Sequence, residues 1–148
     1  MDLIADVGEG CGSDAAIIPL VTRCNIACGG HAGDEDSMRE ALRLAKEHQV
    51  LAGAHPSYPD RTHFGRRPMA LKGETLQAVI AEQLTALRHL ADEEGVSLSH
   101  VKPHGALYHA AAKDRLTAEG VLAATVAVLG PVAIIGSPSS VLGEVTAE

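Results

Sequence analysis

Residues 50–69, VLAGAHPSYPDRTHFGRRPM, indicate the fold class most directly. The first part of this stretch, VLAGA, is a short apolar run of the length of a buried strand, and it passes directly into His55. Residues 55–69 form a loop that is too rich in Pro, Arg and His to be a linker, and loops of more than about 12 residues are usually functional or disordered. Apolar residues at helical spacing then predict an amphipathic helix over residues 74–94, which Gly95 ends. The stretch therefore predicts a strand, a functional loop and a crossover helix.

The same unit recurs on both sides of this stretch. Apolar runs predict further strands at residues 2–7, 22–28, 97–101 and 131–137. Helical patterns predict four further helices, at residues 15–21, about 36–48, 110–113 and 116–129. Ser37 is the predicted cap of the second, and a loop at residues 102–108 precedes the third. Five strand-then-helix units predict one α/β domain over residues 1–148, with a parallel sheet in either a barrel or a doubly wound layout.

The composition limits the class of protein. Hydrophobic residues make up 46% of the chain but aromatic residues only 2%, so the core is expected to be aliphatic. The net charge of -7 and the lack of any basic run exclude nucleic acid and anionic membranes as expected partners. No stretch matches a membrane span or a signal peptide, which predicts a cytoplasmic protein, and three cysteines in such a chain are expected to be reduced thiols.

Polar and ionisable side chains follow four of the predicted strands, at the point where each strand ends. They are Asp6, Glu9, His31, Asp34, His55, Lys102 and His104. The carboxyl ends of parallel strands meet at one edge of the sheet, and ligands bind at that edge. His48 and His89 instead fall on predicted helices. We therefore expect the first set to form one functional site.

Residues 24–36, CNIACGGHAGDED, allow three interpretations. Cys24, Cys28 and His31, joined by Cys11, are possible zinc ligands, although the spacing C-x3-C-x2-H is not a compact zinc pattern and both cysteines of the stretch fall in or beside a strand. Buried free thiols are the expected state of the cysteines. Alternatively, the stretch is the rim of an active site, whose glycines permit the turn that aims His31.

The third interpretation is a phosphate-binding loop. The turn GEGCG, residues 8–12, resembles the start of a dinucleotide-binding fingerprint, but Ser13 stands where the third glycine of G-x-G-x-x-G would fall. The backbone N–H groups of such a turn can still receive an anion.

A carboxylate on the first strand and two or three histidines on later strands suit Zn, Mn or Fe, with open positions for water. Without a metal, the same residues can perform general acid–base chemistry. Lys102 is a candidate for binding a carboxylate or a developing oxyanion, and Arg61, Arg66 and Arg67 are candidates for an anionic ligand. The residues alone leave these alternatives open.

Four motifs together resemble the LamB/YcsF family. They are DVGEG (residues 6–10), NIACGGHAGD (25–34), GAHPSYPDRTHFGRR (53–67) and SHVKPHGALYH (99–109). The resemblance covers nearly the whole chain and implies an irregular (β/α) barrel of the glycoside hydrolase/deacetylase type. It also implies the opening of 5-oxo-L-proline to L-glutamate by an ATP-hydrolysing 5-oxoprolinase, in which this chain works with subunits B and C.

The resemblance also implies roles for residues. The family motifs fall on the catalytic candidates Asp6, Glu9, His31, His55, Lys102 and His104. Candidates for binding ATP are Gly8, Gly10, Gly29, Gly30 and Arg66, and no Walker motif is present. Related deacetylase-like barrels use one Asp and two His as metal ligands, which implies Asp6, His55 and His104 for a possible divalent metal.

Family members are longer than this chain, which ends after the fifth predicted strand and the start of its helix. We therefore expect a truncated barrel with two unpaired edges, and association into a homo-oligomer. Two other functions stay open: a metal-dependent, deacetylase-like hydrolase that acts without ATP, and a non-catalytic subunit or interaction module.

Overall fold

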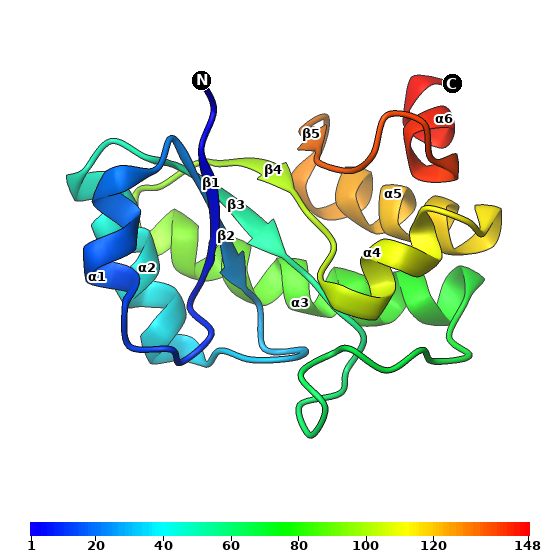
Figure 1. The fold of residues 1–148 in the computed structure, drawn as a ribbon, viewed down its shortest axis with the longest axis horizontal. Helices are drawn as coiled ribbons and strands as arrows, with labels where there is room; N and C mark the ends of the chain where they lie inside the picture. The colour runs from blue at the N-terminus through cyan, green and yellow to red at the C-terminus, as the bar shows by residue number, and fades with distance from the viewer.

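A computed structural model describes residues 1–148 and contains one sheet of five parallel strands (Figure 1). The strands are β1 (Ile4–Val7), β2 (Arg23–Ala27), β3 (Leu51–His55), β4 (Leu98–Val101) and β5 (Ala133–Ile134). They lie in the order β1-β2-β3-β4-β5. A doubly wound sheet reverses its strand order at a switch point, whereas the wall of a β/α barrel does not. The predicted parallel α/β fold is confirmed, and the sequential order selects the barrel layout.

Helices connect the strands and cover the sheet. They are α1 (Asp14–Ile17), a 3₁₀ turn (Ile18–Leu20), α2 (Glu35–Glu47), α3 (Gly73–Glu94), α4 (Gly105–Ala111), α5 (Arg115–Leu129) and α6 (Val141–Ala147). Helix α3 packs along α5 and also contacts α2, and the three helices lie outside the sheet (Figure 1). None of the helices is long and apolar enough to cross a membrane.

Helix α2 begins one residue before the predicted start. Its cap is Asp34, whose carboxylate accepts the backbone N–H of Ser37, while the Ser37 hydroxyl accepts the backbone N–H of Asp34. This capping box stabilises a helix start by about 1 kcal/mol. The prediction of Ser37 as the cap is therefore wrong by one turn, since Asp34 caps the helix; Asp34 also lines a pocket together with Glu9 and His31.

Helix α3 buries one apolar stripe and one amide. The stripe includes Leu76, Ile80 and Leu84, and Gly95 ends the helix in the left-handed conformation at φ 66°. The buried amide of Gln83 receives the backbone N–H of Ser57 at 3.0 Å and donates to the Ser57 carbonyl at 2.8 Å. It therefore fixes the start of the loop that follows β3.

Two predicted boundaries differ from the structure. Helix α4 starts at Gly105, inside the segment predicted as a loop, and its N-cap residue His104 makes no capping hydrogen bond through its side chain. The fifth strand has only two residues, Ala133 and Ile134, and α6 follows it as the start of the fifth predicted helix.

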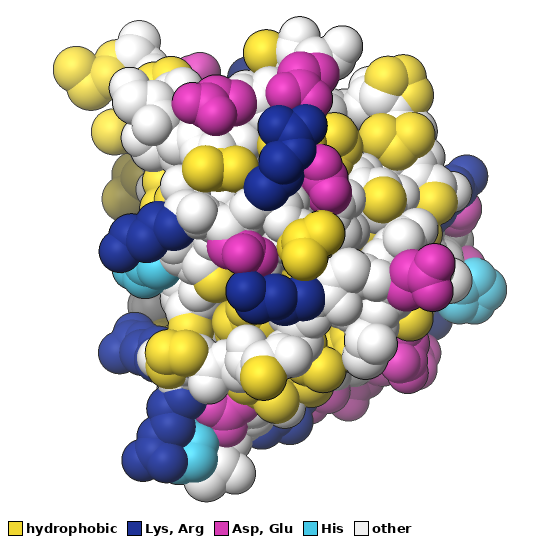
Figure 2. All heavy atoms as spheres, turned by 90° about the vertical axis from the view of Figure 1, so that its right-hand side faces the viewer, with side chains coloured by type: hydrophobic (Ala, Val, Ile, Leu, Met, Phe, Trp, Pro, Cys, Tyr) yellow, Lys and Arg dark blue, Asp and Glu magenta, His cyan; other side chains and the backbone are white.

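The core is aliphatic, as predicted, and Tyr58 is the only aromatic residue among its 28 members. On the face at the right of Figure 1, basic, acidic and apolar side chains alternate, so that face has no continuous basic surface (Figure 2). The carboxyl ends of β1 to β4 face the side on which the long loop after β3 lies (Figure 1).

Candidate active site

Four side chains meet where β1 to β4 end. Glu9 follows β1, His31 follows β2, His55 closes β3 and His104 follows β4. One potential ligand atom from each lies within 4.8 Å of the other three, and all three histidines are buried. We call these four residues the Glu–His cluster. Its donor atoms, three imidazole nitrogens and one carboxylate oxygen, are those that divalent metals such as Zn²⁺ accept.

Asp6 lies beside this cluster and is held by three partners. Its Oδ1 accepts from Asn25 Nδ2 at 2.7 Å, and Lys102 Nζ donates to Oδ1 and Oδ2 at 2.8 and 3.0 Å. Its Oδ2 lies 3.3 Å from His55 Nε2. Burial on its own would raise the pKa of the Asp6 carboxyl. A hydrogen bond and the positive charge of His55, together with hydrogen bonds from Lys102 and Asn25, outweigh burial and hold that pKa far below its usual range. Asp6 is therefore a carboxylate paired with an ammonium group.

A row of residues in register across four strands supports Asp6. Asp6 pairs with Asn25, Asn25 with Gly53, and Gly53 with His100. Because Gly53 has no side chain, the His100 ring reaches across β3, and its Nε2 lies 2.8 Å from Asn25 Oδ1. Asn25 uses its N–H₂ group for Asp6, so its oxygen is the acceptor and His100 Nε2 is the donor.

His100 is fully buried and uncharged. Burial, followed by the positive charge of Arg23, lowers its pKa to about 4. Its second ring nitrogen, Nδ1, lies 2.8 Å from the hydroxyl of Ser99. A neutral His100 thus orients Asn25, and Asn25 orients the carboxylate of Asp6.

Backbone carbonyls set the orientation of two histidines of the cluster. His55 Nδ1 lies 2.6 Å from the carbonyl oxygen of Lys102, and His104 Nε2 lies 2.8 Å from that of Phe64. A carbonyl oxygen only accepts, so both of these nitrogens carry hydrogen. The other nitrogens, His55 Nε2 and His104 Nδ1, lie 3.1 Å apart and face the cluster.

The charge of Glu9 is balanced only by histidines. Its Oε1 lies 2.8 Å from His31 Nε2, 3.8 Å from His55 Nε2 and 3.6 Å from His104 Nδ1, and no Lys or Arg side chain pairs with it. Burial would raise the pKa of Glu9, but the His31 hydrogen bond and the charges of the histidines outweigh burial and lower it. Nδ1 of His31 is buried and has no hydrogen-bond partner.

The loop after β3 closes over the cluster. Phe64 adopts a left-handed backbone at φ 55°, and its ring packs edge-on against His31 and His104. Gly65 is needed beside it, because a Cβ at that position would lie 2.9 Å from Cβ of His31. Arg61 donates to the carbonyl oxygens of Gly29 and Gly33 at 3.0 and 2.8 Å, which ties this loop to the loop after β2.

Next to the cluster lies an open pocket of about 330 Å³. Its lining includes two members of the cluster, the Asp6–Lys102 pair and further residues of the surrounding loops: Asp6, His55, Arg66, Lys102, Pro103, His104, Gly105, Tyr108 and His109. The guanidinium of Arg66 lies over the ring of Phe64, 5.2 Å from its centroid. The pocket therefore combines two permanent cations with the imidazoles of the cluster.

The glycines predicted to bind ATP are mostly occupied within the protein. The Gly8 N–H donates to the Asp14 carboxylate at 2.7 Å, and the Gly29 N–H donates to the Ala32 carbonyl at 2.8 Å. A Cβ on Gly30 would lie 2.5 Å from side-chain atoms of Gln83 and Ser57, so Gly30 serves packing. Gly10 has nothing within 4 Å of its Cβ position.

The cysteines do not join the cluster. Cys11 is exposed, whereas Cys24 and Cys28 are buried, and burial raises the pKa of both buried thiols to about 12. The Cys28 thiol donates to the Ile26 carbonyl at 3.1 Å. The buried thiols are thus neutral, as expected from the sequence, and a zinc site of three cysteines and His31 has no support.

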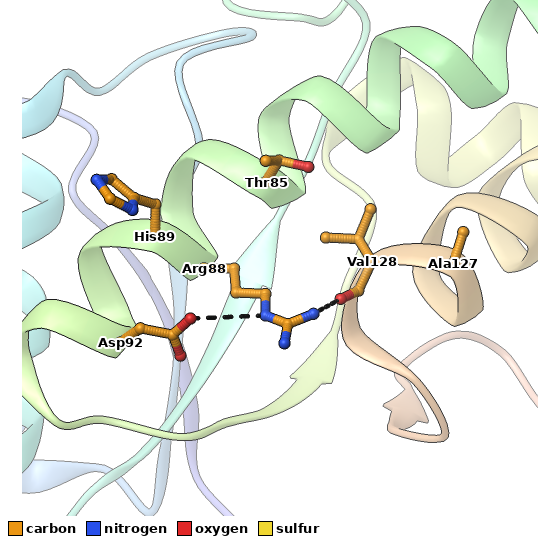
Figure 3. A pocket seen from close by; sticks show the side chains of 6 residues that line it. All are labelled: Thr85, Arg88, His89, Asp92, Ala127 and Val128. Carbon is orange, nitrogen blue, oxygen red and sulfur yellow. Dashed lines mark hydrogen bonds and ion pairs between the residues drawn. The ribbon is translucent and has the colours of Figure 1, made fainter.

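A larger depression of about 430 Å³ lies on the outer side of the helices, between α3 and α5 (Figure 3). Arg88 crosses it, paired with Asp92 at 3.7 Å and with the carbonyl oxygen of Val128. It contains neither the cluster nor any residue predicted for the site. The candidate site therefore remains the cluster at the strand ends.

The structure brings together all six catalytic candidates, namely Asp6, Glu9, His31, His55, Lys102 and His104. Sequence reasoning missed Asn25, Gly53 and His100, which lie inside strands and not at their ends. A polar residue and a glycine within otherwise apolar strands were the available signal.

Three comparisons place the chain among known proteins. The model of the LamB/YcsF family matches residues 1–148. The A subunit of the 5-oxoprolinase from Erwinia tasmaniensis is 49% identical over 140 residues, which are 95% of this chain and 57% of that protein. The crystal structure of the lactam utilization protein from Thermus thermophilus superposes with a TM-score of 0.94 at 43% identity, over 99% of this chain and 62% of that chain. The chain thus spans less than two thirds of either relative.

Proposed function

The chain belongs to the LamB/YcsF family, and we propose that it acts in a 5-oxoprolinase as the A subunit does in its relative. In this proposal it works with subunits B and C to convert 5-oxo-L-proline to L-glutamate at the expense of ATP. The names of its two relatives support this, since one belongs to a 5-oxoprolinase and the other is a lactam utilization protein. 5-Oxoproline is a five-membered lactam that carries a carboxylate. Because the reaction needs ATP, we propose the cytoplasm as its location.

The observation that carries the proposal is the pocket beside the Asp6–Lys102 pair. Lys102 and Arg66 give it two cations, which suit the substrate carboxylate and an oxygen that gains negative charge. The side chain of Lys102 is 26% exposed, so a ligand can reach it. His55 and His104 line the same pocket, within reach of a bound lactam ring.

The chemistry needs activation because an amide carbonyl is a poor electrophile. Transfer of the γ-phosphoryl group of ATP to the lactam oxygen releases ADP and makes the ring carbon electrophilic. Water then attacks that carbon, and the ring C–N bond of the tetrahedral adduct breaks as the amine takes up a proton, which leaves an acyl phosphate. A second water hydrolyses the acyl phosphate and releases phosphate and the new carboxylate of glutamate. We assign activation of water to Nε2 of His55, with Asp6 as the alternative base.

The remaining residues of the site position these groups. Lys102 stabilises the oxygen at which charge develops, and it keeps Asp6 ionised. Glu9 and His31 hold each other at 2.8 Å, and His104 lies against His55, so the cluster keeps the base in place.

We propose that ATP is bound largely by the partner subunits. Most of the glycines predicted for this role are occupied, which leaves Gly10 and Arg66 as the candidates in this chain. The isolated chain is therefore expected to be inactive toward 5-oxoproline.

The second candidate function is metal-assisted hydrolysis of an amide without ATP. The specific observation in its favour is the Glu–His cluster, whose donor atoms fit a divalent metal. Such an ion would polarise a carbonyl group and lower the pKa of a bound water. Both functions use the same pocket, so the requirement for ATP separates them.

The sheet also supports self-association as a proposal. Strands β1 and β5 each have one unpaired edge, and Leu3 and Ile4 beside the β1 edge are 50% and 41% exposed. Light scattering after size exclusion tests this, and a stable monomer at micromolar concentration would contradict it.

The test of function is reconstitution of the chain with subunits B and C. We expect glutamate and ADP to form in equal amounts, only when 5-oxoproline and all three proteins are present. Glutamate formation by the chain without ATP would instead establish the second candidate. Absence of turnover in the complex, although the three proteins co-purify, would favour a non-catalytic role.

A further inference from the structure

We infer that Glu9, His31, His55 and His104 form a binding site for one divalent transition-metal ion, and that Asp6 lies outside the set of ligands. This site shares His55 and His104 with the pocket of the proposed function. A bound ion would occupy His55 Nε2, so Asp6, the alternative base, would then activate water, and metal binding itself is measured without turnover. The ligand set also differs from the one that related barrels imply, which contains Asp6 in place of Glu9 and His31.

The first observation is the close approach of two ring nitrogens, His55 Nε2 and His104 Nδ1, whose partner nitrogens are both bonded to carbonyl oxygens. The carbonyl oxygens of Lys102 and Phe64 require hydrogen on His55 Nδ1 and His104 Nε2. In neutral rings, His55 Nε2 and His104 Nδ1 then both present lone pairs, only 3.1 Å apart. Two lone pairs at this distance repel each other unless a cation or an added proton lies against both.

The second observation is the arrangement around these rings. Histidines that bind metals usually donate their other ring N–H to a backbone carbonyl or a carboxylate, which fixes the nitrogen that faces the ion. His55 and His104 both have this arrangement, with carbonyl partners from two different loops. The ring of His104 is further held by stacking on His31, at 3.6 Å between centroids and 2° between planes.

The third observation separates the two carboxylates. Both oxygens of Asp6 receive hydrogen bonds from Lys102, and one also receives the amide of Asn25, so this carboxylate already has its counter-charge. Glu9 is only slightly exposed and has no Lys or Arg partner, although three imidazoles surround its Oε1. Three neutral imidazoles and one carboxylate leave a net charge of one minus, which favours a divalent cation.

The test measures metal binding directly and uses the chain without a histidine tag. Purified protein is stripped with a chelator, dialysed and titrated with Zn²⁺ by calorimetry. Co²⁺ serves as a second probe, because tetrahedral coordination by nitrogen and oxygen gives visible absorption bands. We expect one ion per chain, with at least tenfold weaker binding in Glu9→Gln and in His55→Gln.

Two matched variants provide the comparison. Asp6→Asn is expected to bind the ion within threefold of the wild-type affinity, since it changes the other carboxylate. His109→Gln removes an imidazole that lines the pocket but lies outside the cluster, and it is also expected to bind normally. Thermal unfolding of each stripped variant shows whether it is folded, and the rise in Tm on adding Zn²⁺ gives a second measure of binding.

Three outcomes decide the inference. Binding that is lost in Glu9→Gln and kept in Asp6→Asn establishes the ligand set. Binding that is lost in Asp6→Asn and kept in Glu9→Gln overturns it in favour of Asp6. No stoichiometric binding by the wild-type chain also overturns it, and leaves a proton shared among the histidines as the explanation. A chain that binds the ion yet gives no turnover with subunits B and C overturns the proposed function alone.

Discussion

Lys102 Nζ bridges the two oxygens of Asp6, at 2.8 and 3.0 Å, from a strand end three strands away in the sheet. The pair is partly exposed, so it contributes no more than about 1 kcal/mol to stability. The Asp6–Lys102 pair instead places a fixed cation and a fixed anion next to His55. The first prediction separates these two effects.

Lys102→Met keeps most of the side-chain volume and removes the charge. We expect the turnover of the reconstituted complex to fall about 100-fold, because an oxygen that gains charge loses its donor, while the free energy of unfolding changes by less than about 1 kcal/mol. Steady-state kinetics and urea unfolding measure both quantities. Lys113→Met is the control, since Lys113 lies outside the pocket, and equal losses in the two variants would contradict the role of Lys102.

Gly53→Ala tests the row of residues across the sheet. A Cβ at position 53 would lie 2.3 Å from the His100 ring, which is fully buried and hydrogen-bonded on both sides. We expect the free energy of unfolding to fall by about 2 kcal/mol, the usual cost of overpacking.

The double variant Gly53→Ala/His100→Ala provides the control for this prediction. Removal of the ring makes room for the new methyl group, so the two losses in unfolding free energy are expected to sum to more than the loss in the double variant. Additive losses, or a Gly53→Ala variant as stable as the wild type, would show that the ring is free to move.

His100 also predicts a dependence of stability on pH. Its pKa is lowered to about 4 in the folded chain and is about 6.5 when unfolded, so below pH 6.5 the unfolded state takes up a proton that the folded state does not bind. Stability therefore falls as the pH decreases, by about 2 kcal/mol between pH 7 and pH 5 from this group, and the effect levels off below pH 4.

The measurement is urea unfolding of the wild type and of His100→Gln at several pH values. The variant still offers a donor to Asn25 but does not titrate in this range, so its stability is expected to depend less on pH than that of the wild type. Parallel curves for the two proteins would contradict the buried, neutral state of His100.

Thiol labelling tests the state of the cysteines. Only the exposed Cys11 is expected to react with a thiol reagent at neutral pH in the native chain, because Cys24 and Cys28 are buried and their pKa values lie near 12. Mass spectrometry after brief labelling should find one modified cysteine, and all three after unfolding. Fast labelling of Cys24 or Cys28 would contradict the packing of β2 and its following turn.

The sequence predicted the parts of the site in which an ionisable residue follows the end of a predicted strand. Apolar runs located β1 to β4, and ionisable residues at their ends located Glu9, His31, His55 and His104, because parallel strands bring such positions together. The barrel layout was not predictable from local pattern, since it depends on the order of strands in space.

Other features depend on tertiary contacts that have no local pattern. Asn25 and His100 are far apart along the chain, and only the pairing of strands places Gly53 between them. Asp34 was assigned to the rim because it is acidic and follows a strand, and it lines a pocket with Glu9 and His31; its carboxylate also accepts a free N–H at the start of α2, which the sequence did not predict. In such cases the backbone of the protein is itself the partner, and the side chains alone do not reveal it.

The carbonyl groups of Lys102 and Phe64 illustrate this for mutagenesis. Each fixes a histidine through an atom that every amino acid possesses, so replacing either side chain leaves the hydrogen bond to the imidazole available. An alanine scan would record the charge of Lys102 and the ring of Phe64 and would miss this second contribution of both residues. Replacing the peptide bond by an ester at these two positions, which weakens the carbonyl as an acceptor, would reveal it.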